Sequence, residues 1–390
     1  MRPTNRELIA GYAGRLNPAL LTGQAVTSPL GVWLLLALLA PAGQGGGRER
    51  LEEVLGAPAD DAAARAAELL GEPHPAVTAA AAVWDRLLGP TFDEWASGLP
   101  AVVERGPVPS QSDADAWARE RTLGMIEEFP LEIDVLTRLI LASALATDIS
   151  WVQPLEEADG LLTFGDGIQL VAETEAAGLV AVAAPPSSSA LDVFSVIAAP
   201  DVSPGRVDAA AHQVAALLAG DEGSARRLPV EELADGHAWT VSERQETRSG
   251  AAEQEEWQTY LPAWSAKSDH DLRAAPGMAE VFETMSGFAR PEDQPVSFEA
   301  RQAAVAAYTR TGFKAAAVTA VGMRAAGMPD FHDVLVRRVE LRFDRPYAVL
   351  ACAALHDGPE AWRGVPVFSA WVADRAGRSV GTQMAVRMVI

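Results

Sequence analysis

The sequence predicts an α+β protein that folds as a single domain over residues 1–390. Helical patterns gather early in the chain and strand-like apolar runs gather late, with no internal repeat and no clear linker between them. Hydrophobic residues make up 49% of the chain, which suffices for a sizeable core and excludes a disordered polymer.

Helical patterns are expected at 5–16, from Ser28 to about 40, and at 48–55, 59–71, 113–129 and 207–218. Ser28 is a good N-cap and Pro29 suits the first turn of the apolar helix that follows. The glycine-rich run 44–47 predicts a break, and Gly56 predicts a helix end.

Strands are expected at 77–84, 136–151, 191–199, 339–355 and 365–373. Residues 136–151 are almost continuously apolar, which suits a central strand buried on both faces. The polar stretch 243–256 is a loop or a solvated edge strand, and residues 259–278 begin as a strand and become a helix.

Charge and composition limit the kinds of partner and the cellular location that the sequence predicts. The formal net charge of −22 repels nucleic acid and anionic lipid, so neither is expected as a partner. The N-terminus lacks the apolar stretch of a signal peptide, and Val32–Ala42 is too short to span a bilayer. A soluble cytoplasmic protein is the default expectation, with non-classical export left open.

Catalytic and metal-binding patterns are missing from the sequence. The six histidines form no HExxH pair, and one cysteine, Cys352, builds neither a zinc cluster nor a disulfide framework. Nucleophile-elbow, dinucleotide and phosphate-loop motifs do not occur. We therefore expect no enzyme, no metal and no cofactor, with Cys352 in the core and the histidines on surface loops.

The segment 310–329 has an unusual composition of small residues and glycines. An alanine-rich helix is one interpretation. However, several of its residues lower helix propensity, namely Gly312, Val318, Thr319, Val321 and Gly322. The alternative is a segment that is a loop in one state and a strand in another.

Six segments resemble the serpin family, and they occur in the family's order along nearly the whole chain. They are AVTSPLGVWLLLALLAPAGQGGGRERLEEVLG (25–56), WARERTLGMIEEF (117–129), LTRLILASALATDISWVQPL (136–155), YLPAWSAKSDHDLRAAPGMAEVF (260–282), Gly312 with AAAVTA (315–320), and FDRPYAVL (343–350). The resemblance implies a serpin fold of three β-sheets, about nine helices and an exposed reactive loop at about 312–338. A C-terminal extension would follow at about 374–390.

Inhibitory members of that family act by a mechanical switch. A serine protease cleaves the reactive loop, which then inserts as a new strand into the main sheet with the acylated protease attached. The resemblance therefore implies an inhibitor of serine proteases that needs no catalytic residue. The alternative is a non-inhibitory binding or interaction protein with the same fold.

The resemblance assigns the hinge of the loop to nine residues: Gly312, Phe313, Lys314, Ala315, Ala316, Ala317, Val318, Thr319 and Ala320. An inserted strand alternates with period two, so if Phe313 faces inward, Ala315, Ala317 and Thr319 do as well. Phe313 stands where the family favours Thr or Ser, and its bulky ring is expected to obstruct early insertion. Arg310 stands where the family has Glu.

The family's spacing from the hinge glycine puts the scissile bond at Ala326–Gly327, and Arg324–Ala325 is the second choice. Ala326 suits elastase- or subtilisin-like proteases, whereas Arg324 suits trypsin-like ones. The acidic helix at 59–71 lacks a basic patch, so no polyanion cofactor is expected.

Residues beneath the main sheet complete the resemblance. Ser28, Ser143 and Gln302 align with the polar network through which the family's sheet opens, and Trp151 aligns with the breach at its end. Gln302 both donates and accepts hydrogen bonds, so an altered network is one hypothesis. The other is that the three are ordinary polar residues of the core.

Overall fold

The computed structural model describes residues 2–86, 88–221, 223–249, 253–289, 298–313, 331–373 and 387–389. Within these ranges it contains three large β-sheets and eight α-helices, which confirms the predicted α+β class. The helices are α1 (Asn5–Leu20), α2 (Pro29–Leu39), α3 (Gly45–Leu55), α4 (Ala59–Gly71), α5 (Pro90–Ser97), α6 (Gln111–Arg121), α7 (Pro204–Leu218) and α8 (Met278–Ser286).

Helix α2 begins as predicted. The Ser28 hydroxyl accepts the Gly31 N–H at 3.3 Å, and Pro29 is the first helical residue. Every residue of α2 is buried, because neighbouring elements cover it all round.

Two predicted helix boundaries were wrong. Residues 45–47 start helix α3 and do not form a break, because this end packs against α8: a Cβ on Gly47 would lie 3.2 Å from Glu283 Oε2. The Arg50–Glu280 ion pair at 2.8 Å joins the same two helices. Helix α6 ends at Arg121, well short of residue 129, because Leu123 and Gly124 turn the chain through left-handed conformations.

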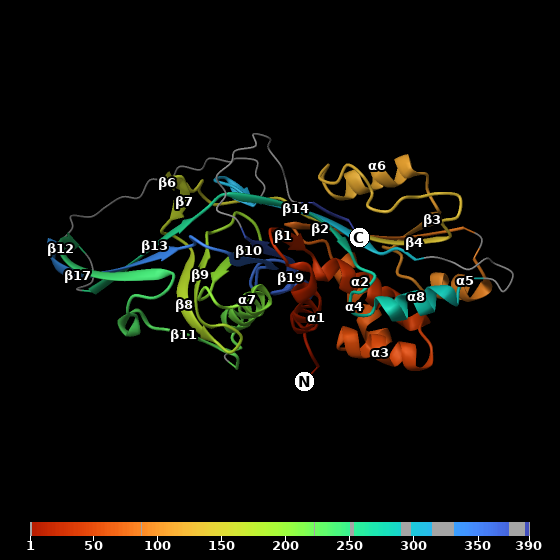
Figure 1. Cartoon of the computed structure of the whole chain (residues 1–390), viewed down its shortest axis with the longest axis horizontal. Helices are drawn as coiled ribbons and strands as arrows, with labels where there is room; N and C mark the ends of the chain where they lie inside the picture. Colours follow the sequence, from red (N-terminus) through yellow and green to blue (C-terminus); the bar gives the residue numbers. More distant parts are fainter. Residues whose placement is uncertain are drawn as a thin grey trace.

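The sheet that matters for the candidate site has six strands. Their order is β14 (Trp264–Asp271), β15 (Arg301–Tyr308), β20 (Arg387–Val389), β4 (Leu139–Thr147), β2 (Val77–Asp85) and β3 (Glu104–Pro107). In Figure 1 this sheet crosses the upper half of the molecule from β14 to β3, with α2, α4 and α8 below it and α6 above. Helix α2 therefore supports the sheet from beneath.

A seven-stranded sheet forms the second large sheet. Its order is β1 (Ala25–Thr27), β19 (Pro366–Val372), β18 (Tyr347–Ala353), β10 (Leu191–Ile197), β9 (Gly178–Ala184), β8 (Ile168–Thr174) and β11 (Ala225–Arg227). Helix α7 covers one face of it and buries a second apolar cluster.

The third large sheet has five strands, in the order β12 (Trp239–Ser249), β17 (Phe331–Arg342), β13 (Glu253–Leu261), β7 (Leu161–Phe164) and β6 (Glu156–Ala158). Strand β12 is the solvated edge strand that was one of the two predictions for 243–256. Strand β13 lies inside the sheet, parallel to β17. A separate pair joins β16 (Gly312–Phe313) to β5 (Ile149–Ser150).

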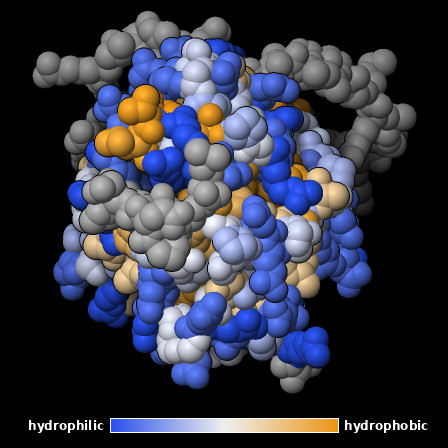
Figure 2. All heavy atoms as spheres, turned by 90° about the vertical axis from the view of Figure 1, so that its right-hand side faces the viewer, coloured by the Kyte–Doolittle hydropathy of each residue, from blue (hydrophilic) through white to orange (hydrophobic). Residues whose placement is uncertain are grey.

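The face of the molecule at the α5 and α6 end is mostly polar. Figure 2 faces the end of the molecule that carries α5 and α6, and hydrophilic residues cover most of it, with a few orange apolar ones. In the described part of the chain, the most exposed large apolar side chains are Val135 and Leu136, between α6 and β4. None of the helices that the structure describes is long and apolar enough to cross a bilayer.

Candidate functional site

The predicted hinge begins at a tight turn that follows β15. After Tyr308 the chain reverses, and the Thr309 N–H donates to the Gly312 carbonyl at 2.9 Å. Gly312 and Phe313 then pair antiparallel with Ser150 and Ile149 of β5, which directly continues the path of β4. The first two hinge residues therefore already lie beside the chain that leaves β4.

Trp151 fastens this turn. Its ring nitrogen donates to the Thr309 carbonyl at 3.0 Å, and its backbone N–H donates to the Thr311 carbonyl at 3.1 Å. The indole also packs on Tyr308, with ring centroids 5.0 Å apart. The predicted breach residue thus lies where β4 ends and the hinge begins.

Phe313 faces inward, which is the condition from which the alternation was argued, and is 1% exposed. Its ring meets the edge of the Trp264 ring at a centroid distance of 6.3 Å. The core already accommodates this ring beside Ile149, and its expected obstruction of early insertion stays a prediction. The other predicted hinge residues and both candidate scissile bonds lie outside the described residues, namely 314–320 and 324–327.

The predicted end of the reactive loop was wrong. Residues 331–338 belong to β17, which pairs with β12 on one side and β13 on the other. Val334 and Val336 are buried at alternate positions, as in a strand with one face on the core. Residues 331–338 are therefore not part of the predicted loop.

Strand β20 separates β15 from β4. Its three residues come from the predicted C-terminal extension and pair antiparallel with both neighbours. In the described residues, β15 and β4 share no direct ladder, so β20 fills the position between them.

The three polar residues predicted beneath the sheet are all fully buried, and they converge on the start of α2. Gln302 of β15 accepts the Ser28 N–H at 3.2 Å and donates to the Ser28 carbonyl at 3.1 Å. Ser143 of β4 donates to the Gly31 carbonyl at 3.0 Å. The strands on either side of β20 are therefore tied to one helix turn, although the three side chains do not bond to each other directly.

The sequence prediction missed two further members of this cluster. Thr27 donates its hydroxyl proton to the Gln302 side-chain oxygen at 2.7 Å. His270, which pairs with Gln302 across β14 and β15, donates from Nε2 to the Val26 carbonyl at 2.8 Å. Burial lowers the pKa of His270 and favours this neutral form. The only sequence signal was its place in the segment 260–282, which resembles the serpin family.

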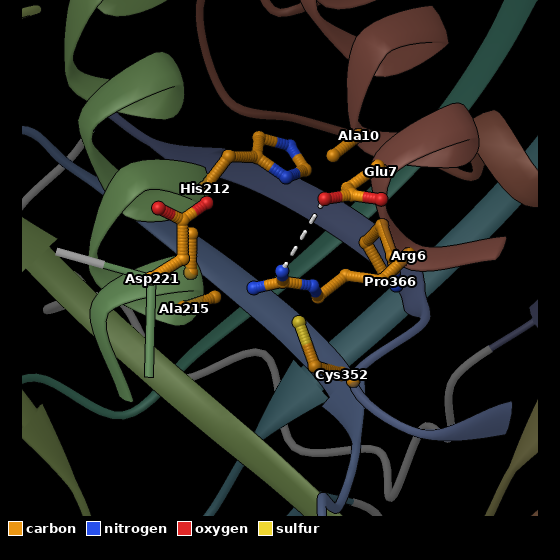
Figure 3. A pocket seen from close by; sticks show the side chains of 10 residues that line it. Arg6, Glu7, Ala10, His212, Ala215, Asp221, Cys352 and Pro366 are labelled. Atoms are coloured by element: carbon orange, nitrogen blue, oxygen red, sulfur yellow. Dashed lines mark ion pairs between the residues drawn. The ribbon is translucent and has the colours of Figure 1, made fainter. Parts of the chain in front are cut away.

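A second site is a small cavity of about 60 Å³ between α1, α7 and β18, shown in Figure 3. His212 lines it and lies 3.8 Å from the buried Asp208 carboxylate, so the prediction that histidines lie on surface loops was wrong here. Burial lowers the pKa of His212 and raises that of Asp208.

Cys352 also lines this cavity and is 3% exposed, which confirms its prediction as a core residue. Burial raises the pKa of its thiol far above the ordinary range. The thiol therefore stays protonated and is a poor nucleophile, and the cavity contains no activated nucleophile among its described lining residues.

No family model and no curated protein sequence matches this chain. Solved structures do. The native state of the thermophilic serpin tengpin matches with a TM-score of 0.63 at 15% identity, over 95% of this chain and 93% of that one. Human thyroxine-binding globulin in complex with thyroxine matches with a TM-score of 0.62 at 12% identity, over 96% of this chain and 100% of that one.

A cleaved serpin, Serpin 42Da, matches with a TM-score of 0.59 at 13% identity, over 97% of this chain and 98% of that chain. These matches extend over nearly the full length of both chains. The chain therefore has the serpin fold.

Proposed function

We propose that this chain inhibits serine proteases by presenting residues from Gly312 to about Met328 as bait. Cleavage of this segment frees its N-terminal part, which then inserts as a strand between β15 and β4. The protease is carried along as an acyl-enzyme and distorted. The inhibitor supplies no catalytic group in this scheme.

One observation carries the proposal. The chain reverses at Thr309–Gly312, and Gly312–Phe313 is already paired at the mouth of the position between β15 and β4. An insertion that starts here needs no new turn and continues a strand that has begun. The small residues that follow, Ala315 to Ala317, fit a strand packed in a sheet.

The driving force is the pairing gained by a strand that enters the middle of a sheet. Each ladder hydrogen bond contributes a net ~0.5–1.5 kcal/mol. A loop of ten or so residues, bonded on both sides, therefore gains on the order of ten kcal/mol before its ordering entropy is subtracted. Such a gain is available only after cleavage releases the loop from its far end.

The scissile bond in this proposal is Ala326–Gly327, with Arg324–Ala325 as the second choice. The target proteases differ accordingly, being elastase- or subtilisin-like for the first bond and trypsin-like for the second. Mass spectrometry of the released C-terminal fragment identifies the bond directly.

The test is incubation with an elastase-, a subtilisin- and a trypsin-like protease, followed by denaturing electrophoresis. A complex stable in SDS, and a large rise in the melting temperature of the cleaved protein, support the proposal. Clean cleavage with no complex and no gain in thermal stability overturns it.

A matched pair of variants tests whether formation of the protease complex depends on insertion of the loop into the sheet. Alternation from the inward-facing Phe313 puts Ala317 on the buried side of an inserted strand and Ala316 on the outer side. Ala317→Arg would bury an unpaired charge and abolish the complex, whereas Ala316→Arg would leave most of it.

A non-inhibitory binding protein is the second candidate. It is favoured by the occupied position between β15 and β4, which in this structure already holds β20. Thyroxine-binding globulin shows that a protein of this fold binds thyroxine. If this candidate is right, cleavage yields two fragments with unchanged thermal stability for all three proteases.

A further inference from the structure

The C-terminal strand β20 lies in the interior of the six-stranded sheet. Ala303, Ala304 and Val305 of β15 face Val389, Met388 and Arg387, in that order. On its other side, Val389 faces Ala144 of β4. This segment is therefore held between two strands that are far from it in sequence.

The hinge and β20 run in the same direction along the same edge of the chain formed by β4 and β5. Both are antiparallel to the chain of β4 and β5: Phe313 faces Ile149, and Val389 faces Ala144. If the antiparallel pairing of Phe313 with Ile149 continued without a bulge at Asp148, each later residue of the loop would face the preceding residue of β4. Val318 would then face Ala144, at the position that Val389 occupies.

The two occupants exclude each other. Adjacent strands are about 4.7–4.9 Å apart, so a row between two strands holds one chain only. By the same register, β20 covers the positions of residues 316–318. Insertion from Phe313 meets β20 within three residues.

The strands β15 and β4, which flank β20, are also both hydrogen-bonded to the start of helix α2. Gln302, beside Ala303 in β15, is bonded to Ser28, and Ser143, beside Ala144 in β4, is bonded to Gly31. The single turn Ser28–Gly31 thus holds both strands at the level of β20. A wider gap that admits two chains would break these buried hydrogen bonds.

We propose that the position between β15 and β4 is a strand-binding site whose resident ligand is the chain's own C-terminal segment. In this role β20 limits insertion of the loop to its first residues until it is expelled. Because β20 has only three paired residues, a released loop of greater length outcompetes it. The pairing of β20 is independent of the proposed inhibition; only its role as a brake rests on that function.

A disulfide tests the position of β20 without weakening the fold. Ala303 and Val389 are directly opposite, and Ala303 is partly exposed. Directly opposed residues have Cβ atoms about 4.5–5.5 Å apart, within reach of a disulfide after a small adjustment. Ala303→Cys/Val389→Cys should crosslink at least about tenfold faster than Ala303→Cys/Ala376→Cys, because the rate follows the fraction of time spent in contact. Equal rates overturn the proposal.

A proline tests the competition. Met388→Pro removes a backbone donor in the middle of β20, whereas Ala376→Pro places the same residue before the strand. The probe is a synthetic peptide of residues 312–325, added to the uncleaved protein and followed on native gels. Peptide uptake should be at least about tenfold faster in Met388→Pro than in wild type, and equally faster in a chain that ends at Ala373. A tenfold change requires only a small loss in the free energy that holds β20 in the sheet. Unchanged uptake in both overturns the proposal.

The same proteins separate this inference from the proposed function. If the crosslink forms and Met388→Pro admits the peptide, while no variant forms an SDS-stable complex with any protease, the strand-binding site stands and the inhibitory function fails. If complexes form at equal rates in wild type, Met388→Pro and the oxidised double-cysteine protein, inhibition stands and the brake is refuted.

Discussion

The ring nitrogen of Trp151 donates a hydrogen bond to the carbonyl of Thr309 at 3.0 Å. This bond joins the end of β4 to the turn where the hinge reverses. Trp151 is 3% exposed and Thr309 is of intermediate exposure, so the bond is partly buried. A partly buried hydrogen bond of this kind resists opening because the carbonyl loses its donor when the bond breaks.

Trp151→Phe is expected to loosen the turn. The phenyl ring keeps contact with Tyr308, but the Thr309 carbonyl loses its donor, at a cost of about 1–3 kcal/mol in the free energy of unfolding. Hydrogen exchange of the amides of Thr309 and Gly312 should accelerate. Trp362→Phe, which removes a similar bond to the Glu72 carbonyl, is the control: it should leave exchange in this turn unchanged. Equal exchange in both variants would refute the role of Trp151.

Phe313→Thr is expected to destabilise the uncleaved protein. The ring is buried beside Trp264, and truncation of a buried Phe costs about 3–5 kcal/mol when it is replaced by Ala. The loss should approach that range, measured by chemical unfolding. Val135→Thr, at a side chain that is 82% exposed, should change stability by less than about 0.5 kcal/mol.

The same variant decides whether Phe313 obstructs insertion. The ring is already placed in the core, so we expect Phe313→Thr to form protease complexes no faster than wild type. A clear acceleration would show that the bulky side chain slows the first step.

The sequence was most informative where local chemistry decides structure. Ser28 and Gly56 marked helix ends correctly, because a side-chain cap and a left-handed glycine act within one turn. Residues 45–47 were assigned wrongly as a break, because packing against Glu283 and α8 outweighs the low helix propensity of glycine. Helix propensities and capping patterns cannot predict a contact with a residue as distant in sequence as Glu283.

The candidate site shows the same division. Gln302 and Ser143 were identified through resemblance alone, and their partner turn at Ser28–Gly31 joins residues more than a hundred positions apart. The place of β20 had no sequence signal, because a strand pairs through backbone groups that every residue carries. Period-two alternation predicted only which hinge residues share a face with Phe313, and the inward direction of Phe313 itself comes from the structure.

Gln302→Ala is expected to weaken the anchor between β15 and α2. The substitution leaves the Thr27 hydroxyl and the Ser28 N–H and carbonyl without their buried partner. Each group left unsatisfied lowers the free energy of unfolding by up to about 1–3 kcal/mol. Chemical unfolding should show a loss of at least about 2 kcal/mol. Gln153→Ala, at an exposed position, should have no measurable effect. A loss below that of typical surface variants would mean that the cluster contributes no stability.

Acidification from pH 7.5 to 5 is expected to destabilise the protein, in part through His74. This residue is 6% exposed, its Nδ1 accepts the Ala76 N–H at 3.2 Å, and burial lowers its pKa below the ordinary value of 6.5. The unfolded chain therefore binds the proton first. The contribution of neutral His74 is fully present above pH 6.5 and is lost as the pH falls below it.

His74→Phe should reduce this loss of stability, because the phenyl ring keeps the contact with Trp362, where the ring centroids lie 5.3 Å apart, and cannot be protonated. Melting temperatures of wild type and variant, measured in steps from pH 7.5 to 5, give the difference directly. His356→Phe, at an exposed position, should follow the wild-type curve. If the curves of wild type and His74→Phe run parallel throughout, protonation of His74 is not coupled to unfolding, and its burial has no thermodynamic consequence in this range.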